Sequence, residues 1–165
     1  PKWQERPLLI VVRRDGAEIR IDAGPFTEFT DNPKNEGMSG GGATYEAWKR
    51  YRIFTPNTVL LHSSAGPGGE DYVLFVAVAP LAPRLTRCFT IQSRNYALDK
   101  DRELRDMQAL ILEQDQPIVE SQRPEELPDD LAAEMHVKGA DAGTLEYRRW
   151  LIEISNGTYE MAPNQ

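Results

Sequence analysis

This 165-residue sequence contains one cysteine, Cys88, and two histidines, His62 and His136. A single cysteine permits no internal disulfide and no cysteine-based zinc site, and it is consistent with a reducing, cytoplasmic location. With only these two histidines, no Ser-His-Asp arrangement is credible.

Long apolar runs and basic clusters are missing as well. The longest apolar run, residues 73–79, is far shorter than the roughly 20 residues that span a bilayer, and the N-terminus has no signal-peptide pattern. The formal net charge is −7, and adjacent basic residues occur only in pairs such as Arg13-Arg14 and Arg148-Arg149. Nucleic acids need a broad basic face, so the sequence predicts neither a nucleic-acid partner nor a membrane.

The pattern of apolar residues predicts an antiparallel sheet in a single domain. Two strands, at residues 8–13 and 17–22, are expected to join through a tight turn at Asp15-Gly16. Residues 30–44 end in three glycines and predict a mobile loop, because a phosphate-binding loop needs Lys-Ser/Thr after its glycines. Four more strands are expected at residues 45–54, 58–64, 71–79 and 84–94.

Two helices are expected after the strands. The first covers residues 104–122, with Asp99 as its N-cap, and the second covers residues 143–155. Residues 123–143, rich in proline and acid, are expected to be irregular. A long helix packed across a curved antiparallel sheet is the α+β arrangement called helix-grip, of the START and Bet v1 type, with a cavity between helix and sheet.

Asp115 is the unusual residue of the first helix. At about 100° per residue it projects within the apolar stripe formed by Leu104, Met107, Ile111 and Ile118. Burying a lone carboxylate costs several kcal/mol, so a bound cation, a basic partner or protonation is expected. From periodicity alone, a local ion pair of Asp115 with Arg94 or Arg87 is slightly favoured.

A motif surrounds this acid. Residues 112–125 read LEQDQPIVESQRPE and contain the pattern E-x-D-x-x-x-x-E-x-Q, with SRNY before it at 93–96 and EYRRWL after it at 146–151. These runs resemble Rieske non-haem iron oxygenases, and most nearly the vanillate and dicamba O-demethylase type. The resemblance covers most of residues 45–155 and is weak over residues 1–44.

The resemblance implies a mononuclear Fe(2+) with Asp115 as its carboxylate ligand. With the resemblance included, metal ligation is favoured over a local ion pair as the role of Asp115. It also implies a [2Fe-2S] Rieske cluster, which takes two cysteines and two histidines, and NADH as the electron source through a reductase or ferredoxin. One cysteine excludes that cluster here, and the family's C-x-H, C-x-x-H and H-x-x-x-x-H segments are absent. Residues 1–165 are therefore expected to be the C-terminal part of the oxygenase catalytic domain, without the Rieske domain and the iron-histidine segment.

The resemblance places His62 and Val76 at strand positions that line the substrate pocket. His62 shares a strand face with Leu60 and Ser64, so a hydrogen bond to a substrate requires that face to be the cavity side. A core histidine with satisfied hydrogen bonds is an equal alternative. His136 is expected to be exposed or salt-linked, because its spacing from Asp115 does not indicate shared ligation.

Two functions follow as hypotheses. The first is the C-terminal catalytic portion of a Rieske-type monooxygenase or dioxygenase in aromatic compound catabolism, which uses O₂ to hydroxylate or O-demethylate a small aromatic substrate and works as a homotrimer when full-length. The 165-residue chain alone would then be inactive. The second is a non-enzymatic helix-grip module that binds a small apolar ligand without metal.

Overall fold

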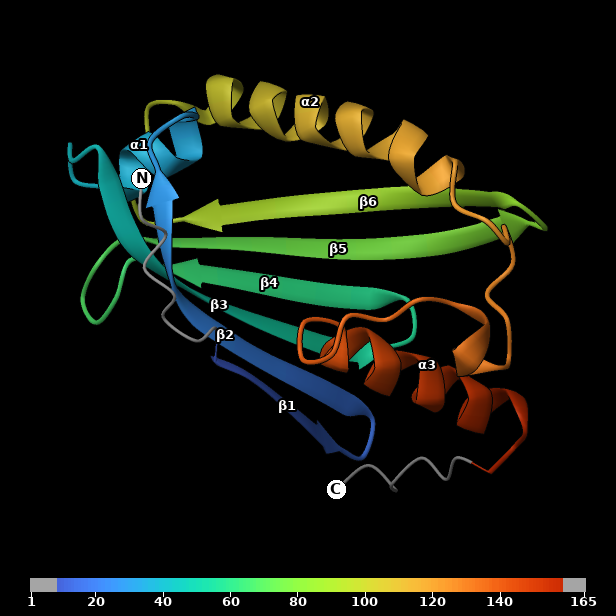
Figure 1. The fold of residues 1–165 in the computed structure, drawn as a ribbon. Coiled ribbons are helices and arrows are strands. Elements are labelled where there is room, and N and C mark those ends of the chain that lie inside the picture. The colour runs from blue at the N-terminus through green and yellow to red at the C-terminus, as the bar shows by residue number, and fades with distance from the viewer. Residues whose placement is uncertain (1–8, 159–165) are drawn as a thin grey trace, which may run out of the picture.

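The computed structural model describes residues 9–158, in which six strands form one antiparallel sheet (Figure 1). The strands pair in sequence order, β1-β2-β3-β4-β5-β6, so β1 and β6 are the two edges. Their bounds are β1 (Leu9–Asp15), β2 (Glu18–Phe29), β3 (Thr44–Thr55), β4 (Thr58–Ser64), β5 (Asp71–Ala82) and β6 (Leu85–Arg94). All six predicted strands are thus confirmed, and Leu8, the expected start of the first, lies outside the described residues.

Strand register assigns each side chain to one of two faces. Ile21 pairs with Tyr51, Tyr51 with Leu61, and Leu61 with Leu74. Paired residues share a face because side chains alternate along each strand. A Cβ built on Gly143 would lie 2.3 Å from Ile21 Cδ1, so the last helix packs on this side. We call it the helix face and the opposite side the outer face.

The helices lie on the helix face. They are α1 (Pro33–Met38), α2 (Asp101–Glu120) and α3 (Ala142–Ser155), with a short 3₁₀ turn at Leu131–Ala133. Helix α3 packs against β1 and β2, whereas α2 begins beside α1 and runs along the edge strand β6 (Figure 1). No helix in the described part of the chain is long and apolar enough to cross a membrane.

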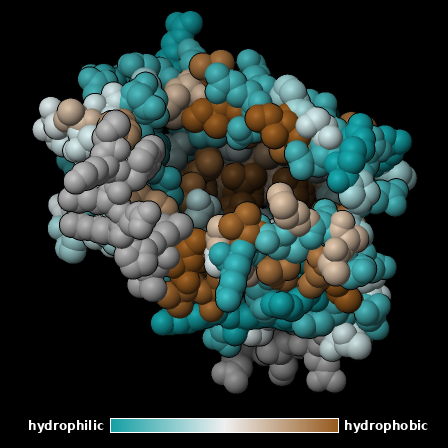
Figure 2. All heavy atoms as spheres, viewed as in Figure 1, coloured by the Kyte–Doolittle hydropathy of each residue, from teal (hydrophilic) through white to brown (hydrophobic). Residues whose placement is uncertain are grey.

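Buried residues gather at two places and leave the middle of the helix face open. One cluster lies by α1 and comprises Met38, Tyr45, Ala47, Tyr72 and Tyr96. The other includes Ile19 of β2 and Trp150 of α3, with the guanidinium of Arg14 over the indole ring. Figure 2 shows a hollow between these regions whose floor is hydrophobic.

The α+β class and the long helix across the sheet are confirmed, but two local predictions are wrong. Residues 30–44 are not a loop throughout, because Asn32 caps α1 by accepting a hydrogen bond from the Asn35 N–H, and Pro33 occupies the first turn. Asp99 is not the N-cap of α2; Lys100 holds that position and makes no side-chain cap. Residues 123–141 are irregular apart from the 3₁₀ turn, as predicted.

Candidate functional site

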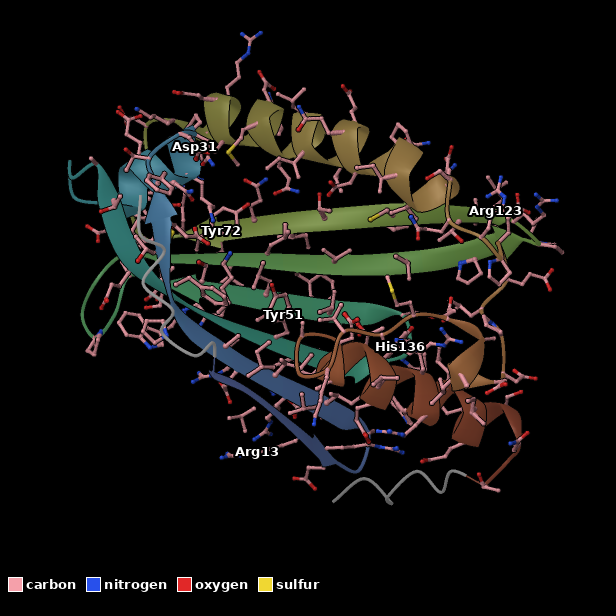
Figure 3. All side chains as sticks on the ribbon, viewed as in Figure 1. Arg13, Asp31, Tyr51, Tyr72, Arg123 and His136 are labelled. Carbon is pink, nitrogen blue, oxygen red and sulfur yellow. The ribbon has the colours of Figure 1, made fainter. Side chains whose placement is uncertain are left out.

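Helix α2 is anchored only near its beginning. Of its twenty residues Leu104 and Gln108 alone are buried, and the phenol of Tyr72 on β5 donates a hydrogen bond of 3.2 Å to Gln108 Oε1. Gln108 therefore faces the sheet. Figure 3 shows Tyr72 on the sheet beneath the first half of α2.

Asp115 lies two turns further along the same side of α2. Seven residues at about 100° each differ from two full turns by only about 20°, so Asp115 projects in nearly the same direction as Gln108. It is exposed, because this half of α2 spans the open part of the helix face instead of packing on the sheet. Asp115 is therefore an exposed carboxylate on the side of α2 that Gln108 turns toward the sheet.

The ion pair considered for Asp115 is not formed. Arg94 pairs with Asp101 and donates to the carbonyl of Ala97. Within residues 9–158 no hydrogen bond or ion pair engages the Asp115 carboxylate, and Arg87 is exposed. Two residues beyond Asp115, Pro117 lacks an N–H, so the carbonyl of Glu113 loses its usual helical donor although α2 continues unbroken to Glu120.

The helix face also carries a cavity with an apolar floor. Val76 pairs with Val59 and Val59 with Ile53, which places a row of aliphatic side chains across the helix face. Together with Val78 and Tyr147 of α3 these residues line a cavity of about 260 Å³. The Tyr147 hydroxyl donates to the carbonyl of Pro56, and burial raises the pKa of Tyr147, so the ring stays neutral and fixed at the cavity wall.

His62 lies on the other side of the sheet from Val76. His62 pairs with Val73, three residues from Val76, and an odd separation along a strand reverses the face. Its Nε2 lies 2.7 Å from Asp71 Oδ1, and its ring lines a separate pocket on the outer face. The condition for His62 to contact a ligand in the hollow, that its face be the helix face, is not met. A substrate contact of His62 therefore stays a prediction that applies only to the outer pocket.

His136 is engaged elsewhere too. It lies in the segment between α2 and α3 (Figure 3), with Nε2 3.0 Å from the carbonyl oxygen of Leu131. No group of three or more His, Cys, Asp or Glu side chains in the described part of the chain is arranged to hold a metal ion. Neither histidine is brought to Asp115: within residues 9–158, His62 contacts Asp71 and His136 contacts the carbonyl of Leu131.

Two features of the site were not predicted. The Tyr72–Gln108 hydrogen bond orients α2. The sequence indicates it only through Gln108, a polar residue on the same side of the helix as Leu104 that is buried in the structure. Cys88 is exposed on β6, where its pairing with Val78 places it on the helix face.

Curated relatives of this chain are demethylases. The chain is 28% identical over 160 residues to methylxanthine N3-demethylase NdmB of Pseudomonas putida, which covers 97% of this chain and 41% of that protein. It is 28% identical over 110 residues to methylxanthine N1-demethylase NdmA of the same species, which covers 67% of this chain and 30% of the relative. The chain therefore spans well under half the length of these relatives.

Two solved structures and one family model also match this chain. A mutant of NdmA from Pseudomonas putida CBB5, with caffeine, matches with a TM-score of 0.68 at 24% identity over 91% of this chain and 38% of that one. The same mutant with theobromine matches with a TM-score of 0.69. These structures support the helix-grip arrangement. The model of the vanillate O-demethylase oxygenase C-terminal domain matches residues 22–156, so this chain belongs to that family and is the C-terminal part of a Rieske oxygenase catalytic domain.

Proposed function

We propose that this chain is the C-terminal catalytic portion of a Rieske-type oxygenase that hydroxylates or demethylates a small aromatic substrate, and that Asp115 is the carboxylate ligand of its mononuclear Fe(2+). The observation that carries the proposal is the position of Asp115: an accessible carboxylate without a protein partner in residues 9–158, on the side of α2 that Gln108 turns toward the sheet.

The described residues offer one of the three protein ligands that the iron site needs, the carboxylate. A carboxylate and two neutral imidazoles on one face of Fe(2+) leave positions for O₂, and Asp115 is free to be that carboxylate. His62 and His136 are not available, since His62 lies on the outer face and His136 contacts Leu131. The two imidazoles, and the [2Fe-2S] cluster that passes electrons from NADH by way of a reductase or ferredoxin, are assigned to a separate N-terminal part of the full-length protein.

The chain's own residues bind and orient the substrate. Iron, when bound, supplies the O₂ activation that inserts one oxygen atom into a C–H bond while the other leaves as water. The aliphatic row of Ile53, Val59 and Val76 buries the substrate ring and excludes water from it. The Tyr72–Gln108 hydrogen bond fixes which side of α2, and therefore the side carrying Asp115, is turned toward the sheet.

A demethylation by this route balances in both atoms and electrons. Hydroxylation of a methyl group on oxygen or nitrogen consumes O₂ and the two electrons of NADH, and the product releases formaldehyde to leave the hydroxyl or N–H compound. The proposal includes a homotrimer of the full-length protein, which the family resemblance implies, and a cytoplasmic location, with which the single cysteine is consistent.

The test uses Asp115→Ala, Asp115→Asn and, as the matched control, Glu113→Ala on the outward side of the same helix. In the full-length protein Asp115→Ala is expected to lose the mononuclear iron and turnover, while the Rieske cluster keeps its absorption and EPR signal. Asp115→Asn is expected to retain part of the iron, because an amide oxygen coordinates but carries no charge. Normal turnover of Asp115→Ala would refute the ligand assignment.

A metal-free binding module is the second candidate. It is favoured by the apolar hollow and by the lack of a complete metal cluster in the described residues. The coding sequence upstream of Pro1 distinguishes the two functions. In-frame C-x-H, C-x-x-H and H-x-x-x-x-H motifs would support the oxygenase. An in-frame stop codon followed by a start at Pro1 would support the binding module.

A further inference from the structure

A second cavity lies on the outer face, away from Asp115. It has a volume of about 590 Å³ and lies over β1 to β4, near the loop at Gly66 and Pro67. This volume is in the range of small-molecule pockets, roughly 300–1,000 Å³. The proposed oxygenase site is on the helix face, so this pocket is not part of it.

One row of paired residues crosses the sheet at this pocket. Val11 pairs with Asp22, Asp22 with Arg50, and Arg50 with His62, so four neighbouring strands place these side chains side by side on the outer face. All four line the pocket. The row combines an apolar end, two charged groups and an imidazole within one short span.

Trp48 forms an aromatic wall of the same pocket. A Cβ built on Gly24 would lie 3.4 Å from Trp48 Cδ1, and one built on Gly66 would lie 3.4 Å from Trp48 Cζ3. The indole therefore runs between two glycines that carry no side chain to cover it, and 39% of Trp48 is exposed. An exposed indole in a concave site offers a flat surface on which another ring can stack.

The charges in the pocket are already balanced. Arg50 Nε donates to Asp22 Oδ1 at 2.7 Å, and His62 Nε2 lies 2.7 Å from Asp71 Oδ1. The two terminal nitrogens of Arg50 and the Nδ1 atom of His62 have no partner among residues 9–158, so they remain able to bond a ligand. A neutral ligand with a hydrogen-bond acceptor suits this arrangement better than an ion.

We propose that the outer pocket between Trp48, Arg50 and His62 is a second binding site, for a small neutral aromatic molecule with a hydrogen-bond acceptor at one edge. The ring stacks on Trp48, and the acceptor receives a hydrogen bond from a terminal N–H of Arg50. The site is independent of the iron chemistry, because it lies on the opposite face of the sheet from Asp115.

The test measures binding by saturation-transfer difference NMR on the full-length protein with four probes. Benzamide has both the ring and the acceptor; toluene lacks the acceptor; cyclohexanecarboxamide lacks the aromatic face; benzoate adds a charge. Benzamide is expected to bind most tightly, with a dissociation constant on the order of millimolar, as its few atoms allow.

Variants locate the site. Trp48→Leu is expected to weaken benzamide about three- to tenfold and Trp48→Phe to restore most of the affinity, since a ring face remains. Arg50→Gln is expected to cost about fivefold for benzamide and little for toluene. Arg20→Gln, on the same face but outside the pocket, is the matched control and is expected to change nothing. Melting temperatures check that each variant is folded.

Three outcomes would overturn the proposal. They are equal binding of cyclohexanecarboxamide and benzamide, wild-type affinity in Trp48→Leu, and loss of binding in Val76→Phe with Trp48→Leu unaffected. The last would place benzamide in the hollow on the helix face. It would leave the oxygenase proposal standing, so the two proposals fail separately.

Discussion

The Tyr72 hydroxyl of β5 donates a 3.2 Å hydrogen bond to Gln108 Oε1 of α2, and both residues are buried. Burial raises the pKa of Tyr72 to about 12, so the phenol is protonated and able to donate at any ordinary assay pH. Because Asp115 follows Gln108 by two turns, this bond also sets the direction in which the carboxylate points. It connects a core contact to the proposed iron site.

Removing the donor alone is therefore expected to be harmful. Tyr72→Phe leaves the Gln108 oxygen buried without a partner, at a cost of about 1–3 kcal/mol in the free energy of unfolding. Tyr72→Phe combined with Gln108→Leu removes both partners and is expected to recover most of that loss. Urea unfolding of the three proteins measures this, with Tyr51→Phe as the control. A double variant no more stable than Tyr72→Phe would show that the bond does not carry the effect.

Arg148 of α3 is expected to matter far more than its neighbour Arg149. The Arg148 side chain is 6% exposed, pairs with Glu134 and donates to the carbonyl of Pro128, so it ties the irregular segment to α3. The Arg149 side chain is 55% exposed and meets Glu146 at 3.4 Å. Arg148→Met is expected to lower the free energy of unfolding by about 2–3 kcal/mol, because the Glu134 carboxylate and the carbonyl of Pro128 both lose their partner.

Arg149→Met is the matched control, with an expected change below about 0.5 kcal/mol, as for an exposed pair. Thermal or urea unfolding compares the two variants directly. Equal effects would mean that Arg148 is solvated like Arg149 and does not hold the segment.

Glu18 is expected to give stability that depends on pH. On the outer face Arg13 pairs with Arg20 and Arg20 with Arg52, so three like charges stand in one row. Hydrogen bonds from Arg20 and then Arg52 lower the pKa of Glu18 from its ordinary 4.5 to about 2. A lowered pKa in the folded state stabilises the protein above the ordinary pKa, and this contribution disappears as the pH falls toward the folded value.

Glu18→Gln is accordingly expected to reduce stability near neutral pH by about 1 kcal/mol, the scale of a surface network, and to leave the arginine row uncompensated. The difference from wild type should shrink as the pH falls from about 4.5 to about 2. Chemical unfolding of both proteins at stepped pH tests this. A difference that stays constant across that range would contradict the role given to Glu18.

Alternation and helical period predicted the elements, because each depends only on neighbouring residues. Residues 58–64 are predicted as a strand with the observed bounds of β4, and the predicted helix at 104–122 overlaps most of α2. Period alone does not reveal which side of a sheet the helices cover. The faces of His62 and Val76 depend on the register with β3 and β5, which involves residues far apart in the sequence.

Other differences have local causes. Helix α1 was hidden by the glycines that follow it, although Asn32-Pro33 is a recognisable helix start. Asp115 is predicted within an apolar stripe yet is exposed, because only the first half of α2, at Leu104 and Gln108, has buried side chains. Ile118 and Val119 are 62% and 69% exposed. Helical period detects a stripe but not whether another part of the protein covers it.

The last prediction concerns iron in the 165-residue chain itself. Within residues 9–158 the Asp115 carboxylate is accessible and has no protein partner, while His62 contacts Asp71 and His136 contacts Leu131. Without two imidazoles a single carboxylate holds Fe(2+) poorly, so we expect weak binding and no oxygenase activity. An anaerobic titration with reduced iron measures the affinity, after circular dichroism has shown that the chain is folded. Asp115→Asn should then differ little from wild type. A tight, stoichiometric site that is lost in both His62→Ala and His136→Ala would mean that the two histidines reach Asp115 in solution, and the assignment of the imidazoles to another part of the protein would be wrong.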